Sequence, residues 1–575
     1  MSPIKAAHPP GRDSHDRRRA RQGAQEPAVA ADRVTRDLIV RHFRQIVLWP
    51  LQLLPIRPGQ VQRHWEVFDA LGSESPWVEV IDEFCEDPHD FQERHYREFV
   101  TFLPFAQRFL YGSRVGQEAS PHHGEASIHV YRRSDVRQAR ITLEPGGTAW
   151  TFRVAHVDMH FFLDADIAVI AFEMHADDVP LDIAQDVLFR FGRAYPGFWD
   201  RRGTGGNCPD LVEWLDGSGN VIVASDFSNR AKYLEFVATH RSPCIAAHWE
   251  RLLQPMVLGV PGQSGPLRYR QLEYYRMPFM AFLAFDDPTQ LTRADWVRLG
   301  LVTRPGAPDS LPCAAHTVAD FESRFCDDRF WGRGGRPDAT NTRIVVTGQT
   351  LSMVGSHADP YFSDNTNGML SQFRHQFFLL FLVSHFHKAA LLSMSDELAV
   401  AMNRLTVGET ESVKRFKRTI RQMLEVFLRF THRYWFHQVS NQEGAQIVFT
   451  RLREHLNTQS LYDEVRDEVM DMSNYLDSDS ARRQAATVLR LTVVTILGLL
   501  GTIVTGFLGM NLIAAAEEPM PLRVALFVLT LVVTIGLTAL TIAKSKRLAD
   551  FLDTLSDERL SWRDKLHALR RVALR

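Results

Sequence analysis

Two long apolar runs near the C-terminal end dominate the hydrophobic pattern of the chain. Residues 491–516 form 26 consecutive positions without a charge, and residues 524–543 form 20 more. A helix that rises 1.5 Å per residue needs about 20 apolar residues to cross a hydrocarbon core of about 30 Å. Both runs therefore predict membrane-spanning helices. The nearest competitor, Phe377 to Val383, is too short to span and predicts a buried core helix.

The segment between the two runs is short and contains two acids and two prolines, which predict a turn (Glu517, Glu518, Pro519 and Pro521). The runs therefore form a hairpin with both long flanks on one side. Basic residues gather on the flanks (Arg482, Arg483 and Arg490 before, Lys544, Lys546 and Arg547 after), whereas the connection offers only Arg523. The positive-inside tendency then places the large N-terminal part and the C-terminal tail in the cytoplasm.

An amphipathic pattern precedes the first run and predicts a helical stalk. Neither Pro nor Gly occurs between Gly444 and Gly498, so we expect one helix of about 50 residues, about 75 Å long, that continues into the membrane. Asp463, Asp467 and Asp471 repeat on this helix at a spacing of four residues. Like charges at that spacing repel by a few tenths of a kcal/mol, and a divalent cation would relieve the repulsion. The cluster is either a regulatory metal site or a solvated helix face.

The region upstream mixes strand-like and helix-like segments and predicts an α/β cytosolic domain. From Asp359 onward the pattern is nearly all helical. The expected strands lie at 127–131, 139–143, 148–156, 167–172 and 220–225, and helices are expected at 181–195 and 391–404. The chain thus divides into a disordered basic tail (1–35), the α/β domain (36–350), a helical and stalk region (351–486), the first span (487–511), an external loop (512–522), the second span (523–544) and a cytosolic basic tail (545–575).

Composition and motif content exclude several function classes. The net charge of −2 argues against nucleic-acid binding as the main activity, and the five scattered cysteines form no C-x-x-C pair. The first residues are rich in arginine and lack the apolar stretch of a signal peptide. Neither a Walker A motif nor a hydrolase or kinase signature occurs. An enzyme is therefore the weakest interpretation.

A His-x-Asp-x-His pattern stands in one expected strand. Because side chains alternate along a strand, His156, Asp158 and His160 share one face and could bind zinc. A fourth ligand is not evident, however, and a solvent-facing strand is the favoured interpretation.

The end of the first run carries a more specific motif, Phe507-Leu508-Gly509-Met510-Asn511-Leu512. Its Gly-Met-Asn sequence, at the outer end of the first of two C-terminal spans, resembles the CorA superfamily of divalent-cation channels and transporters. The residues ahead of the motif and the stretch from Phe430 to His455 are also similar to that family. The resemblance implies a CorA-like funnel, a homopentamer in the lipid bilayer whose first spans line the pore.

Physical chemistry gives the motif a function in selecting ions. Mg²⁺ is small and gives up its water reluctantly, so a ring of Asn511 amide oxygens could accept hydrogen bonds from the hydrated ion. Gly509 lets the backbone approach the axis, and Met510 packs the turn. The simpler alternative is a helix C-cap at the membrane surface.

A partly polar stripe runs along one face of the first span and predicts the pore wall (Val488, Thr495, Leu499 and Thr502). Threonines in membrane helices also bond to their own backbone, so packing is the alternative. Mg²⁺ is the expected transported and regulatory ion. Zn²⁺, Co²⁺ or Ni²⁺ transport by the same fold is a close alternative, and a non-conducting membrane-anchored sensor is a further one.

Overall fold

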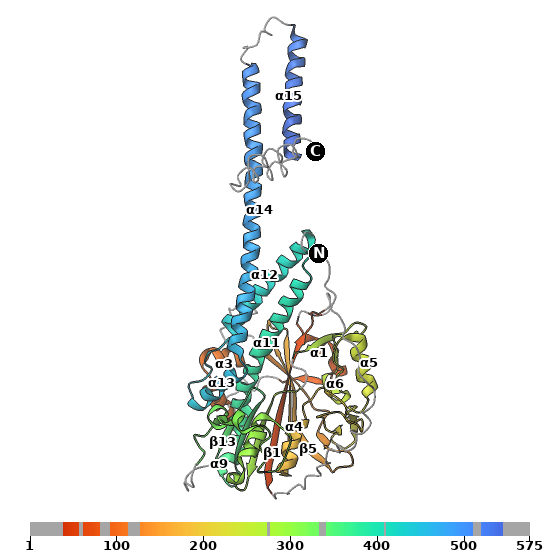
Figure 1. Cartoon of the computed structure of the whole chain (residues 1–575), viewed down its shortest axis with the longest axis vertical. Helices are drawn as coiled ribbons and strands as arrows, with labels where there is room; N and C mark the ends of the chain where they lie inside the picture. The colour runs from red at the N-terminus through yellow and green to blue at the C-terminus, as the bar shows by residue number, and fades with distance from the viewer. Residues whose placement is uncertain are drawn as a thin grey trace, which may run out of the picture.

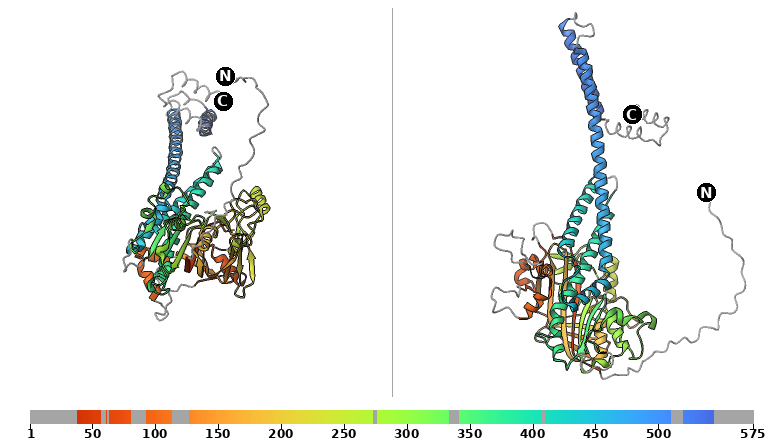
Figure 2. Two further views of the ribbon diagram at one scale, coloured as in Figure 1. Left: turned by 60° about the horizontal axis from the view of Figure 1, so that its bottom comes forward. Right: turned by 90° about the vertical axis from the view of Figure 1, so that its left-hand side faces the viewer.

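The computed structural model describes residues 38–56, 61, 63–80, 93–112, 127–272, 276–332, 341–406, 410–509 and 519–543. A globular α/β domain carries a long helix, α14 (Thr458–Gly509), that projects away from it. A second apolar helix, α15 (Met520–Ala543), lies beside the far end of α14 (Figure 1). Views from two further directions show the same projecting rod and domain (Figure 2). The architecture therefore joins a sheet domain to an extended helical part.

The domain is built on one mixed sheet, which contains 14 strands within the described residues. Its main path runs β12-β13-β14-β11-β1-β6-β5-β4-β7-β8. Most neighbours are antiparallel, whereas β11 and β14 are parallel. The strands are β1 (Ile39–Leu53), β2 (Trp77–Glu79), β3 (Ile128–Arg133), β4 (Gln138–Thr142), β5 (Ala149–Phe162), β6 (Ile167–Pro180), β7 (Leu211–Leu215), β8 (Val221–Ala224), β9 (Met256–Leu258), β10 (Leu267–Gln271), β11 (Phe279–Phe285), β12 (Cys326–Asp327), β13 (Arg343–Val346) and β14 (Thr350–Ser356).

Strand β1 lies at the centre of the sheet and is buried on both faces. Val47, Trp49 and Leu51 contribute to one hydrophobic core, and the alternating Ile46 and Leu48 contribute to the other. Successive side chains of a strand point to opposite faces, so an apolar run of this kind needs a covering layer on each side. The sheet is therefore the middle layer of three.

Helices supply the two outer layers. The first core includes residues of α4 (Leu181–Arg190), α6 (Ala247–Leu253) and α7 (Arg293–Leu301). The second core lies under α3 (Pro104–Tyr111), the π-helix η4 (Phe373–Phe377), α11 (Phe378–Asn403), α12 (Thr410–Arg433) and α13 (Glu443–His455). The remaining α-helices of the domain are α1 (Glu66–Leu71), α2 (Glu93–Thr101), α5 (Arg230–His240), α8 (Phe321–Phe325), α9 (Pro360–Ser363) and α10 (Met369–Gln372).

The expected strand and helix segments agree with this domain in type. Each of the five expected strands overlaps an observed one, and the helices expected at 181–195 and 391–404 correspond to α4 and the end of α11. The helical character after residue 359 is also confirmed. The central strand β1 was not expected, because a run buried on both faces lacks the alternation that identifies a half-buried strand.

Helix α11 confirms the prediction of a buried core helix around residues 377–383. Among the described residues, Met369–Asn403 is long and apolar enough to cross a membrane, with a mean hydropathy of 1.6, but 78% of that window is buried inside the protein. Phe386 illustrates this burial, since its ring stacks on Phe162 of β5 with centroids 3.9 Å apart. The apolar side chains of α11 therefore pack in the hydrophobic core of the domain.

The single unbroken helix expected from Gly444 onward is wrong in one respect. The chain forms α13, leaves the helical path at Leu456 and Asn457, and starts again as α14. Asn457 has a φ of 53°, which is the left-handed conformation that often ends a helix and that Asn tolerates well. A break without Pro or Gly could not be read from helix breakers alone. The 52 residues of α14 nevertheless match the expected length.

Candidate functional site

The predicted filter lies where α14 ends. Gly509 is the last residue of this helix, and Met510 and Asn511 lie outside the described residues. At 1.5 Å per residue, α14 is about 78 Å long, so one rigid element connects the globular domain to Gly509.

The four residues of the predicted pore stripe lie on the outer half of α14. Val488 and Leu499 are 63% and 62% exposed in the single chain. The hydroxyls of Thr495 and Thr502 donate to the carbonyls of Leu491 and Gly498, at 2.8 and 2.9 Å. These bonds satisfy the hydroxyls within the helix, as the packing alternative anticipates, and leave the face of the stripe largely apolar.

Helices α14 and α15 approach each other closely at one glycine. A Cβ atom added at Gly501 would lie 2.8 Å from Cγ2 of Thr534, so a larger residue could not be accommodated without movement. Small residues at such points let helix backbones pack closely, which is the usual way that helices associate in lipid.

The outer parts of these helices expose many large apolar side chains. The described apolar stretches are Thr487–Ile496 in α14 and Met520–Gly536 in α15. Exposed members include Leu491, Phe527 and Ile535, at 66%, 63% and 59%. A continuous apolar surface of this kind is unfavourable in water and is typical of lipid or of further helices as neighbours.

The stalk acids are only partly neutralised within one chain. Arg466 contacts both Asp463 and Asp467, with N–O distances of 3.1 and 3.0 Å, and Asp471 has no such partner among the described residues. The described part of the chain holds no group of three or more acids, histidines or cysteines arranged to bind a metal. Within the described part of one chain, Asp463, Asp467 and Asp471 thus do not form a metal site by themselves.

A comparison with protein families matches residues 394–547 to the family described as CorA-like Mg2+ transporter protein. Over these residues the chain is similar to the CorA superfamily. No curated protein and no solved structure matches the chain. The family indicates a membrane protein related to divalent-cation transporters.

The CorA-like region begins inside α11 and continues through α12, α13, α14 and α15. It therefore includes the predicted stripe, the stalk acids and the Gly-Met-Asn motif, whereas the sheet lies before it. The recognition made from the motif is confirmed at the level of the superfamily.

The His-x-Asp-x-His face of β5 is not solvent-facing, and this prediction is wrong. Asp158 and His160 are 9% and 6% exposed, because the helical layer that begins at η4 covers the strand. Asp158 accepts two hydrogen bonds from Arg132, at 2.7 and 2.8 Å, and His160 packs against the ring of Phe378. Burial lowers the pKa of His160, so the imidazole is neutral there. The face holds a satisfied ion pair and packed rings.

Sequence reasoning missed a buried charge network next to this face. Glu173 of β6 lies between the guanidinium groups of Arg44 in β1 and Arg374 in η4, and the Arg374 bond is 2.8 Å long. Burial by itself would raise the pKa of Glu173, but Arg374 and Arg44 together hold it at about 2. His156 lies 3.9 Å from the same carboxylate. Because the three strands and the helix come together only in the fold, nothing local in the sequence indicates this network.

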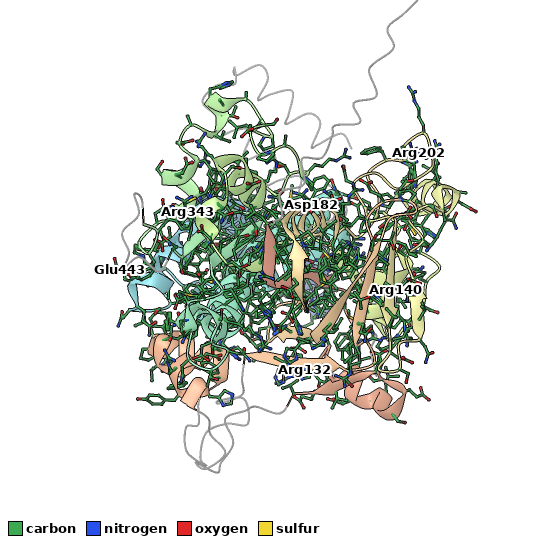
Figure 3. All side chains as sticks on the ribbon, turned by 90° about the horizontal axis from the view of Figure 1, so that it is seen from below. Arg132, Arg140, Asp182, Arg202, Arg343 and Glu443 are labelled. Carbon is green, nitrogen blue, oxygen red and sulfur yellow. The ribbon has the colours of Figure 1, made fainter. Side chains whose placement is uncertain are left out.

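The paired charges of the domain extend over its whole width. Seen from the side opposite α14, Arg132 and Arg343 lie on different parts of the sheet domain (Figure 3). Arg343 donates two hydrogen bonds of 2.8 Å to Asp328, and its guanidinium carbon lies 4.7 Å from the ring centroids of both Trp296 and Trp331. These contacts stabilise the domain.

Proposed function

We propose that this protein is a passive divalent-cation channel or transporter, with Mg²⁺ the favoured ion, that conducts through a homo-oligomeric pore lined by α14. The observation that carries the proposal is the CorA-like match over residues 394–547, which includes the apolar helices and the Gly-Met-Asn motif. Two helices cannot enclose a pore, so several copies must contribute α14 around one axis. The family resemblance favours five.

In this proposal the part of α14 from residue 487 onward and α15 are the two spans, and both termini lie in the cytoplasm at the inner membrane. The exposed apolar surfaces of the two helices and their close approach at Gly501 support a membrane hairpin. An inside-negative potential contributes about 2.3 kcal/mol per charge per 100 mV, so it drives divalent cations inward without a fuel.

A ring of Asn511 side chains would form the filter at the outer end of α14. Neutral amide oxygens accept hydrogen bonds from the water around an ion and hold it less tightly than carboxylates would. The apolar stripe below, with its threonine hydroxyls turned to their own backbone, would let the hydrated ion pass without binding.

The experiment is a flux assay on the full chain in liposomes, with Mg²⁺, Zn²⁺ and Co²⁺ compared in parallel. Asn511→Ala should reduce flux at least about tenfold, since one amide from each subunit is lost from the filter. Asn474→Ala is the matched control, because Asn474 is an exposed residue on the stalk part of α14. Normal flux in Asn511→Ala would remove the filter assignment. Zn²⁺ or Co²⁺ flux above that of Mg²⁺ would change the ion, and a folded oligomer without any flux would favour a sensor.

A further inference from the structure

Helix α12 presents a strongly basic outer face. Its inner face is buried against α11 and α14, through apolar residues at helical spacing (Phe416, Ile420, Met423, Phe427 and Phe430). Basic residues occupy the opposite side, and Arg415, Arg418 and Arg421 are exposed there. Within the described residues, the guanidinium groups of these three arginines have neither an ion pair nor a hydrogen bond. The described part of the chain therefore carries three adjacent positive charges that it does not itself neutralise.

Helix α14 carries an acidic flank, whose charge is opposite in sign to that of the outer face of α12. Glu464, Glu468 and Asp471 follow one another at a spacing of four and three residues, so they share a flank of the helix. No basic side chain pairs with them in the described part of the chain. Burial and the nearby carboxylate of Glu464 raise the pKa of Glu468, which shows that the negative charges are crowded.

The acidic flank and α12 lie on different sides of α14. Tyr462 stacks on Phe427 of α12 with ring centroids 5.4 Å apart, so this residue marks the side that α12 covers. At about 100° per residue, Tyr462 lies about 60° to one side of the buried Val465, whereas Glu464, Glu468 and Asp471 lie about 60° to 120° to the other. The acids of one chain thus cannot reach the outer face of its own α12, so any pairing between these two surfaces joins two chains.

The basic face of α12 and the acidic flank of α14 lie at similar positions along the length of α14. Helix α12 runs beside α14 in the opposite direction (Figure 1). Tyr462 of α14 contacts Thr431 and Phe427 of α12, and these contacts place the two helices in register to within about one turn. About 9 Å from the Phe427–Tyr462 contact, toward the α15 end, α12 reaches Arg421 and α14 reaches Glu468. About 14 Å from it the two helices reach Arg418 and Asp471. Arg421 and Glu468, and likewise Arg418 and Asp471, therefore lie at similar positions along the length of α14.

We propose that the basic outer face of α12 binds the acidic flank of α14 in a second copy of this chain, with Arg421 opposite Glu468 and Arg418 opposite Asp471. The inference rests on the oligomeric pore proposed above. Copies that are related by rotation about an axis parallel to α14 are not displaced along that axis. Residues at the same position along the axis in one chain are therefore at the same position in its neighbours. Because each copy uses one surface as donor and the other as acceptor, the contact is head-to-tail and closes into a ring.

The proposed contact depends on complementary charges between two exposed surfaces. Single exposed ion pairs contribute little, but several level pairs form a network that fixes which surface meets which. The pairs are screened by salt over a distance of about 8 Å at physiological ionic strength. Assembly should therefore weaken as salt rises.

Charge reversal and charge exchange test the contact. The full chain is purified in detergent with EDTA, so that no metal can bridge the acids, and its oligomeric mass is measured by light scattering over a dilution series. Arg418→Glu with Arg421→Glu should weaken assembly about tenfold, and so should Glu468→Arg with Asp471→Arg. The chain that carries all four changes should assemble as the native one does, because the pairs are restored with exchanged signs. Unchanged assembly after either reversal, or failure of the four-fold variant to recover, overturns the proposal.

Disulfide trapping shows whether the contact is between chains. Arg418→Cys combined with Asp471→Cys should yield a ladder of covalent multimers after mild oxidation. Arg418→Cys combined with Arg466→Cys is the matched control, since Arg466 is exposed on another side of α14. A ladder confined to the first pair supports the proposal, and an intrachain disulfide or equal ladders overturn it. A native chain that is monomeric at every concentration would remove the oligomeric pore as well, whereas an oligomer without the ladder would remove only this interface.

Discussion

The globular domain and the projecting helices differ in whether their charged side chains are paired within the chain. In the domain, buried charges are enclosed by partners from distant strands, as Glu173 is by Arg44 and Arg374. On α12 and α14, charged residues are exposed and several have no partner in the described chain, as with Arg418 and Asp471. The buried charge of Glu173 is therefore paired within one chain, whereas the helices expose charged and apolar surfaces that the proposed oligomer and membrane would cover.

The largest expected effect breaks the charge network of the domain. Glu173→Ala leaves Arg44 and Arg374 buried without a counter-charge, and we expect it to lower the free energy of unfolding by about 3–5 kcal/mol. The matched change on the stalk, Glu468→Gln, removes a crowded charge and should leave stability within a few tenths of a kcal/mol. Denaturant unfolding followed by circular dichroism measures both. Equal effects of the two variants would contradict the contrast.

The next effect concerns pH and Glu397, which lies at the border between the two regions. Burial, with further contributions from Asp166 and Asp396, raises the pKa of Glu397 to about 7. An acid with a raised folded pKa binds more protons in the folded state, so its contribution to stability is full below its unfolded value of about 4.5 and is lost as the pH rises through 7.

We therefore expect Glu397→Gln to stabilise the protein at pH 8 by roughly 1–3 kcal/mol and to flatten the stability profile between pH 4.5 and 7. Glu173 provides the contrast, because its folded pKa of about 2 lies below the unfolded value. Its contribution is full above pH 4.5 and is lost as the pH falls toward 2. Thermal unfolding across this range tests both signs.

A smaller effect tests the contact between α14 and α15. Gly501→Ala places a methyl group against Thr534 and should loosen α15 with a strain of about 1–3 kcal/mol. Gly506→Ala is the control, because nothing lies within 4 Å of its added Cβ and both changes raise helix propensity equally. Hydrogen exchange of α15 amides in nanodiscs should accelerate only in the first variant. No difference would argue against a close pairing of the two helices.

The smallest effect is expected in the stripe. Thr495→Val removes a hydroxyl that already bonds to Leu491 within the helix, so flux should change by no more than about twofold. A much larger loss would show that this hydroxyl contacts the passing ion. The same liposome assay that tests Asn511→Ala provides the measurement.

Local patterns in the sequence predicted the two projecting apolar helices, although not the break between α13 and α14. Charge-free length predicted the two apolar helices, and the motif at Gly509 identified the superfamily that residues 394–547 match. These features depend on spacing along one helix, and spacing along a helix is read directly from sequence. The position and contacts of Asn511 stay a prediction.

Contacts between distant segments were decided only by the tertiary structure. The break at Asn457, the cover over His160 and the enclosure of Glu173 each depend on residues that are remote in sequence. The side of α14 that α12 occupies is likewise marked by contacts between distant residues, those of Phe427 and Thr431 with Tyr462. The sequence specifies which residues can share one face of a helix or strand. Which of these faces pack against each other is decided only in the tertiary structure, because burial and charge pairing involve residues from distant segments.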